Sequence, residues 1–151
     1  MVVIVVVVAI IGILASLLLP SLSKARSKAM FALCKNNNRQ ITIAVNLYAT
    51  DDDDTLPFSS WQPTSATYCK NWLYNHGSMA SLEDVKTGLL WPLLENTEVY
   101  HCPVHEDKTY NSQKLTSYIM NSIVQDDFHD NWHRISQFET AFILFWEANE
   151  K

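Results

Sequence analysis

The chain opens with MVVIVVVVAIIGILASLLL (residues 1–19), a run without a charged side chain in which only Gly12 and Ser16 depart from aliphatic residues and Met. At about 1.5 Å per residue, this run makes a helix of about 28 Å, close to the hydrocarbon thickness of a bilayer. Strands usually span about 4–8 residues, and a secretory signal has a basic segment before its apolar core, whereas Lys24 follows this one. The run therefore predicts a helix that spans a membrane or packs in the core of a filament.

The helical pattern continues beyond this run. Pro20 lacks a backbone N–H and predicts a kink or a first break. Residues 21–48 contain neither Gly nor Pro, and apolar side chains recur there at spacings of three and four residues (Met30, Leu33, Cys34, Ile41, Ala44, Val45 and Tyr48). Asp51, Asp52, Asp53 and Asp54 end the pattern, because adjacent like charges repel and Asp favours turns. The sequence predicts one helix of about 50 residues, apolar all round in residues 1–20 and amphipathic in residues 21–50.

The charge of the chain divides at residue 50. Residues 1–50 contain five basic and no acidic side chains, whereas the remaining 101 residues contain all 16 acidic side chains and six basic ones, so that +5 and −10 underlie the net charge of −5. Together with the uncharged apolar run of residues 1–19, this composition excludes a wholly soluble globular chain, a disordered chain and a collagen-like chain. The basic residues lie beside the apolar run and the rest is acidic, which argues against a nucleic-acid partner.

Two patterns disagree about orientation. The positive-inside rule, applied to Lys24, Arg26 and Lys28, places the following domain in the cytoplasm. Three cysteines and an acidic body rich in aromatic residues, Asn, Ser and Thr favour an exported domain. We expect a single-pass protein of the inner membrane, with its head in the periplasm or extracellular space. A basic leader before Met1 would reverse the charge balance, and we expect the N-terminus as written to be incomplete.

Residues 51–151 predict a globular head. Ser81 and Asp84 approximate a capping box that opens a short helix through Val85, and the apolar cluster at 89–94 is expected to fill the core. Short strands are predicted at 97–101, 117–120 and 140–146, with a helical turn or two within 126–137. A small antiparallel sheet packed on a long N-terminal helix follows from this order, in an α+β arrangement.

The sequence resembles a known family. MVVI (residues 1–4), AIIGILASLLLP (9–20) and SLSKAR (21–26) resemble the N-terminal helix of type IV pilins and type II secretion pseudopilins. They most resemble the prepilin-type cleavage/methylation proteins of planctomycetes, verrucomicrobia and lentisphaerae. The likeness continues through CKNN (34–37), YATD (48–51), GLLWP (88–92), HCP (101–103) and SYIMN (117–121).

The resemblance implies a pilin-like fold, a subunit that polymerises with its own or related pilin-like subunits, and processing by a prepilin peptidase where a leader exists. Family members are cleaved after a Gly, methylated on the new N-terminal Phe, and carry a Glu five residues in. This chain as written contains no such Gly, Phe or Glu, and it also lacks the His-x9-Asp-Gly tail of the group. We expect Met1 to be an internal Met of a longer protein, and we expect the sequence to stop short of the family's typical length at both ends.

Candidate ligand sites are few. The run Asp51–Asp54 offers oxygen ligands to Ca²⁺, and some major pseudopilins bind calcium in a loop, but its spacing is not that of an EF-hand and a solvated helix end is favoured. His129 and His133 have a zinc-compatible spacing on a helix, without the Glu of a metalloprotease motif. No other cofactor is expected. No set of nucleophile, base and orienting residue is evident, so we expect no enzyme.

Three cysteines allow three single disulfides, each leaving one thiol. Cys69 with Cys102 is favoured because both lie in the loop-rich head, and Cys34 on the helix is the alternative partner. Five tryptophans offer a sugar-stacking face, but Trp91 and Trp146 are expected in the core, with Trp61 and Trp72 partly exposed.

Two functions remain open from the sequence. The first is a pilin-like or pseudopilin subunit whose helix, including Val2, Val8, Gly12, Leu19 and Pro20, serves membrane anchoring and assembly. Ala9, Gly12, Ala15 and Ser16 would permit close helix approach. The second is a single-pass anchored binding domain, with glycans as a ligand class, that does not polymerise.

Overall fold

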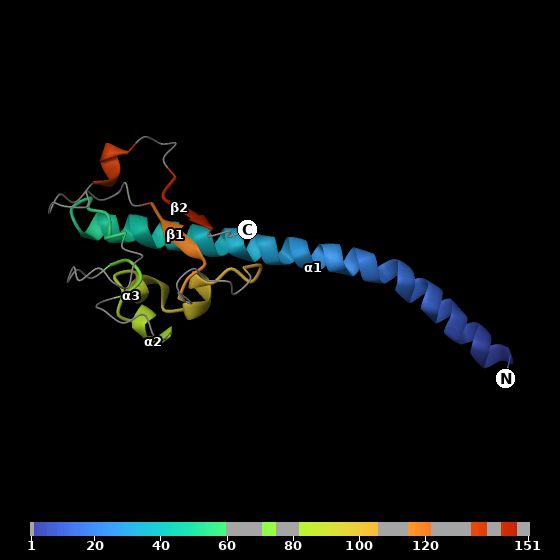
Figure 1. The fold of residues 1–151 in the computed structure, drawn as a ribbon. Coiled ribbons are helices and arrows are strands. Elements are labelled where there is room, and N and C mark those ends of the chain that lie inside the picture. Colours follow the sequence, from blue (N-terminus) through green and yellow to red (C-terminus); the bar gives the residue numbers. More distant parts are fainter. Residues whose placement is uncertain are drawn as a thin grey trace.

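The computed structural model describes residues 2–59, 71–74, 82–105, 115–121, 134–138 and 143–147. One helix, α1 (Val2–Asp51), runs from the free N-terminal end into the head, where all other described elements lie (Figure 1). These elements are α2 (Leu82–Val85), α3 (Trp91–Leu94), the 3₁₀ helices η1 (Thr97–Tyr100) and η4 (Ile135–Gln137), and the strands β1 (Tyr118–Met120) and β2 (Phe145–Glu147). The long helix and the small antiparallel sheet confirm the α+β prediction.

The helix α1 has 50 residues and includes Pro20, so the predicted single helix is confirmed. It stays continuous through the proline and bends in its N-terminal half (Figure 1). Its end lies in the acidic run, as expected. The backbone N–H of Asp54 donates to the carbonyl of Ala49 at 2.7 Å, and both Asp53 and Asp54 have positive φ angles of 51° and 69°. Asp tolerates this left-handed conformation better than most residues, which lets the chain leave the helix in a tight turn.

The sheet consists of two strands. β1 pairs with β2 in antiparallel register, with Ile119 opposite Trp146. β1 lies within the segment predicted as a strand, and β2 overlaps the C-terminal end of the strand predicted at 140–146. Residues 140–142, the first part of that prediction, lie outside the described residues, as do residue 139 and residues 122–133.

The strand predicted at 97–101 is wrong. Residues 97–100 form η1, whose N-terminal N–H groups are capped by Asn96: its side-chain oxygen accepts from the N–H of Glu98 at 2.9 Å. Val99 and Tyr100 are neighbours in sequence and are both buried, at 4% and 0% exposure. A strand would turn two successive side chains to opposite faces, whereas one helical turn directs both into the core.

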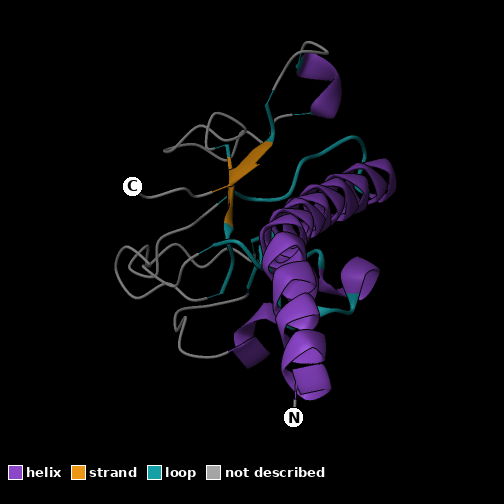
Figure 2. Ribbon diagram, turned by 90° about the vertical axis from the view of Figure 1, so that its right-hand side faces the viewer, coloured by secondary structure: helices purple, strands orange, loops and turns teal. Residues whose placement is uncertain are grey.

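The core forms where the second half of α1 meets the head. One face of α1 supplies Cys34, Ile41, Ala44, Val45 and Ala49 to it. In Figure 2 the short helices and the sheet lie around this part of α1. The elements α3, η1 and β2 all contact α1. The predicted short helix through Val85 is present as α2, and Leu90 from the apolar cluster is fully buried.

Two tryptophan predictions are wrong. Trp72 is 2% exposed and packs against Phe145 and Tyr100, with ring centroids 5.2 and 6.1 Å apart, whereas Trp146 is 42% exposed. Successive residues of a strand face opposite sides, so β2 buries Phe145 and exposes Trp146. Trp91 is half-buried against the core as expected, while Trp61 and Trp132 lie outside the described residues.

Candidate anchoring and assembly surface

The first half of α1 is exposed on every side. Its large apolar side chains are between 49% and 77% exposed from Val2 to Leu19, with Val8 at 62%. Its most apolar window of 18 residues has a mean hydropathy of 3.4 and is entirely unburied, so that α1 has the length and apolarity of a membrane anchor or a signal sequence. Soluble proteins rarely expose contiguous apolar patches above a few hundred Å², and larger patches mark membrane or protein contacts.

Polar groups within this apolar half are satisfied inside the helix. The hydroxyl of Ser16 donates to the carbonyl of Ile13 at 2.7 Å, and that of Ser21 donates to Leu18 at 2.8 Å. A Cβ added at Gly12 would meet nothing within 4 Å. Ala9, Gly12 and Ser16 are three and four residues apart and therefore share one face, on which a second helix can approach closely. Nothing in this segment prevents it from entering an apolar environment.

A disulfide fastens α1 to the head. Cys34 of α1 bonds to Cys102 across a sequence separation of 68 residues, with 4.9 Å between the Cα atoms. The favoured pairing of Cys69 with Cys102 is therefore wrong, and the alternative with Cys34 is confirmed. Cys34 is on the face of α1 that packs on the head, which brings its sulfur to the loop after η1. Cys69 lies outside the described residues.

Hydrogen bonds reinforce this junction. The phenol of Tyr118 on β1 donates to the carbonyl of Cys34 at 3.1 Å. The side-chain amide of Asn37, one turn further along α1, donates to the carbonyls of Glu98 and His101 at 3.3 and 2.9 Å. Both cysteines are 4% exposed. The head therefore holds α1 by covalent, polar and apolar contacts at the same level.

An open groove lies beside this junction. It has a volume of about 580 Å³. Leu33, Asn37 and Gln40 of α1 line one side, and the other side consists of the residues around η1 (Asn96, Thr97, Glu98, Val99, His101 and Pro103). The side chain of Glu98 is exposed, and it carries the acidic group of this lining.

The acidic run at the end of α1 makes separate contacts. Asp52 accepts from the phenol of Tyr48 at 2.9 Å, Asp53 pairs with Arg134 at 3.1 Å, and Asp54 accepts from the N–H and the hydroxyl of Ser136. Asp53 and Asp54 thus tie the end of α1 to η4 and its N-cap residue Arg134, whereas Asp52 bonds back to α1. Within the described residues, no group of three or more His, Cys, Asp or Glu side chains is arranged to hold a metal ion. His129 and His133, the zinc candidates, lie outside those residues.

Two tyrosines near the core have shifted acidities. Burial, together with the hydrogen bond to Asp52, raises the pKa of Tyr48 to about 12. Burial raises the pKa of Tyr100 well above its usual value. Both phenols therefore stay neutral across the physiological range. Their role in this fold is packing and hydrogen bonding.

Comparisons with known proteins add no identification: no family model, curated protein or solved structure matches this chain.

Proposed function

We propose that this protein is a pilin-like subunit of a type II secretion or type IV pilus-like filament. The apolar half of α1 anchors it in the inner membrane, with the head in the periplasm or extracellular space. The same half carries the polymerisation contacts with further pilin-like copies. The proposal rests on one observation above all: a helix of about 28 Å that is apolar on every side projects from a head that does not bury any part of it.

The physical argument concerns where such a helix can rest. Water does not accommodate it, because each exposed aliphatic side chain forgoes about 1.5–3 kcal/mol of burial. A bilayer accommodates it, and so does a bundle of like helices. The head is a compact unit fastened to α1 by Cys34–Cys102, so parallel packing of the helices would leave the heads outside the bundle. The resemblance to pilin-like N-terminal helices supports the filament over a simple anchor.

The test separates filament from anchor by small-to-large changes in the apolar half. Full-length chain is reconstituted in phospholipid vesicles and treated with an amine-reactive cross-linker, and the ladder of products is read on a gel. A filament subunit gives products beyond the dimer. The double variant Gly12→Leu/Ser16→Leu blocks the small-residue face and is expected to shorten the ladder while the chain stays in the membrane.

The matched control enlarges side chains on the opposite face. Val7→Trp/Leu14→Trp adds a volume closer to that of the first variant, about half a turn away on the helix, and should leave more of the ladder than the first variant does. If the full-length chain stays monomeric in vesicles, the filament proposal is overturned. That outcome would identify the chain as a single-pass anchored domain.

A further inference from the structure

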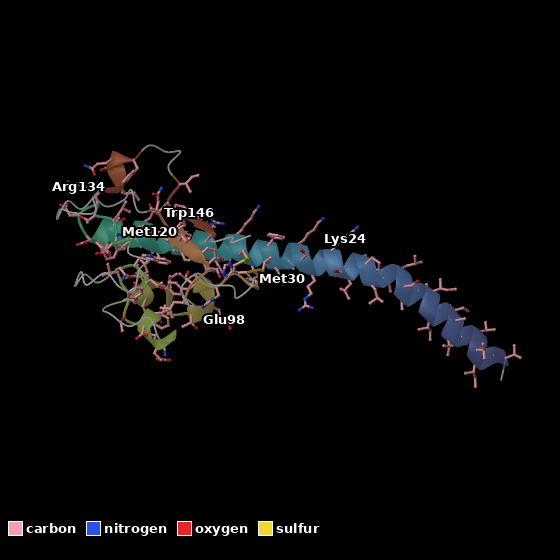
Figure 3. All side chains as sticks on the ribbon, in the orientation of Figure 1. Lys24, Met30, Glu98, Met120, Arg134 and Trp146 are labelled. Carbon is pink, nitrogen blue, oxygen red and sulfur yellow. A yellow bond between two sulfur atoms is a disulfide. The ribbon has the colours of Figure 1, made fainter. Side chains whose placement is uncertain are left out.

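Four of the five cations in the first 50 residues share one face of α1. Lys24, Lys28, Lys35 and Arg39 follow one another at intervals of 4, 7 and 4 residues, so they fall within an arc of about 60°. All four are exposed, and we call them the cationic stripe. In Figure 3, Lys24 projects from the side of α1 opposite to Glu98. The fifth cation, Arg26, lies on another face.

The stripe has no acidic partner within the described part of its own chain. The ion pairs in that part of the chain join Lys86 to Glu83 and Arg134 to Asp53, and neither pair includes a residue of the cationic stripe. Residues 1–50 contain no carboxylate at all. Four like charges on one face repel each other unless an external anion compensates them. An anionic surface placed against the stripe would relieve this repulsion.

Lipid headgroups reach only the lower part of the stripe. At about 1.5 Å per residue, Lys35 and Arg39 lie about 22 and 28 Å beyond Pro20 along the helix. The headgroup layer is about 5–7 Å thick on each side of the bilayer, and charge is screened within about 8 Å at physiological ionic strength. An upright α1 therefore carries the outer two cations beyond the membrane's field. An anionic surface that neutralises them would therefore be that of a protein and not of the lipid headgroups.

The acidic counterpart is on the other side of the same helix. The groove beside the disulfide contacts α1 at Leu33, Asn37 and Gln40, whose mean direction lies about 160° around the helix from the stripe. Glu98 lines this groove, and Glu95 directly precedes its lining residue Asn96. Both carboxylates are exposed, and within the described residues neither makes an ion pair. The head as a whole carries −10.

We propose that the groove bearing Glu98 receives the cationic stripe of a second copy of this chain. Because stripe and groove lie on opposite sides of α1, the contact is head-to-tail and cannot close into a two-fold dimer. Repeating it generates an open chain of parallel shafts. This inference rests on the proposed function and adds to it the polar contact that sets the order of neighbouring subunits outside the membrane.

The experiment measures association between full-length copies in vesicles. Donor and acceptor fluorescent proteins are fused to the C-terminus, and energy transfer is followed as the lipid-to-protein ratio rises. Lys28→Gln/Lys35→Gln and, separately, Glu98→Gln should weaken association about fivefold, the effect of one or two exposed ion pairs. Arg26→Gln removes the same charge from the groove side of α1, where a cation does not attract an incoming stripe, and should not weaken association. Raising the salt concentration from 0.05 to 0.5 M should weaken the association of the unmodified chain more than that of the variants.

Charge exchange makes the test specific. Copies with Lys28→Glu/Lys35→Glu and copies with Glu95→Lys/Glu98→Lys should each associate poorly alone and recover transfer when mixed. If the unmodified chain transfers energy but the stripe and groove variants match it, the inference is overturned and the proposed function stands. If the unmodified chain gives no transfer at any lipid ratio, both are overturned.

Discussion

Cys34 and Cys102 are the residues on which the junction between shaft and head depends most. Their bond closes a loop with a sequence separation of 68 residues, and closing a loop of that size in the unfolded chain is worth about 4 kcal/mol in the chain-entropy model. Both sulfurs belong to the buried core cluster. The disulfide therefore restricts the unfolded head and packs within the folded one.

Removing this bond should lower the free energy of unfolding by about 2–5 kcal/mol. The variant is Cys34→Ser/Cys102→Ser, and the measurement is urea unfolding followed by the fluorescence of the buried Trp72 and the other tryptophans. Cys69→Ser is the control and should leave the urea midpoint in place. Peptide mapping without reductant should recover a 34–102 cross-link, and a 69–102 cross-link would contradict the structure.

Tyr48 and Tyr100 determine how the fold responds to alkali. Their pKa values are raised in the folded state above the unfolded value of 10.0, chiefly by burial. Above pH 10 the unfolded chain loses these protons first, so the unfolded state binds fewer protons and the free energy of unfolding falls as pH rises. The stability that the two neutral phenols contribute is fully present below pH 10 and is lost as the pH rises through 12 and beyond.

Tyr100→Phe should reduce that alkaline loss. The hydroxyl of Tyr100 is buried and has no hydrogen-bond partner among the described residues, so its removal at pH 7 should be neutral or stabilise by up to about 1 kcal/mol. Urea midpoints at pH 7, 9 and 11 measure both effects. A loss of several kcal/mol at pH 7 would show that the hydroxyl has a partner after all.

At the scale of elements, the turn between α2 and α3 depends on a close backbone approach. Gly88 lies against residues 72 and 73, and hydrogen bonds hold the two segments together: the N–H of Leu89 donates to Asn71 at 2.9 Å and that of Leu90 to Trp72 at 3.3 Å. A Cβ at Gly88 would come within 2.5 Å of the carbonyl carbon and oxygen of Leu73. Both atoms belong to the backbone, which cannot move aside without breaking these bonds.

Gly88→Ala should therefore destabilise the head by about 1–3 kcal/mol, as overpacking does in other cores. Gly12→Ala is the matched control, because a Cβ there meets nothing within 4 Å. Urea unfolding of both variants in detergent micelles gives the comparison. Equal midpoints for the two variants would mean that α2 and α3 shift to accept the methyl group.

The sequence predicted the elements whose signal is long and periodic. α1 was predictable because apolar spacing of three and four residues persists through residue 48 and four Asp residues follow. η1 was not, because Val99 and Tyr100 have high β-propensity and only the cap by Asn96 and the shared burial of both side chains make a helical turn there. Strand and 3₁₀ turn differ by tertiary packing that no local pattern records.

The candidate anchoring and assembly surface was predictable in part for the same reason. An apolar run of 19 residues is visible in the sequence, and its exposure in the structure agrees with it. The disulfide partner was not predictable, since the pairing depends on which face of α1 meets the head. Two tryptophans were not predictable either, because Trp72 is buried by tertiary packing against Phe145 and Tyr100, and Trp146 is exposed by the side of β2 on which it lies.

The molecule as a whole consists of two parts that do not share a core. The first buried residue of α1 is Cys34, and every residue from Val2 to Arg26 is exposed. The residues of α1 that belong to the buried core of the head begin at Cys34. The stability of the head therefore depends on the second half of α1, and the first half is left exposed for the membrane or helix contacts that we propose.

Deleting residues 1–25 should for this reason separate the two properties. The shortened chain retains Cys34, the packed face of α1 and the complete head, so its urea midpoint should match that of the full chain within about 0.5 kcal/mol. Having lost the apolar half, it should be monomeric in buffer without detergent, as light scattering after size exclusion would show. A large fall in the midpoint would mean that the exposed segment supports the head, and oligomers of the shortened chain would move the principal assembly contact from the apolar helix to the head.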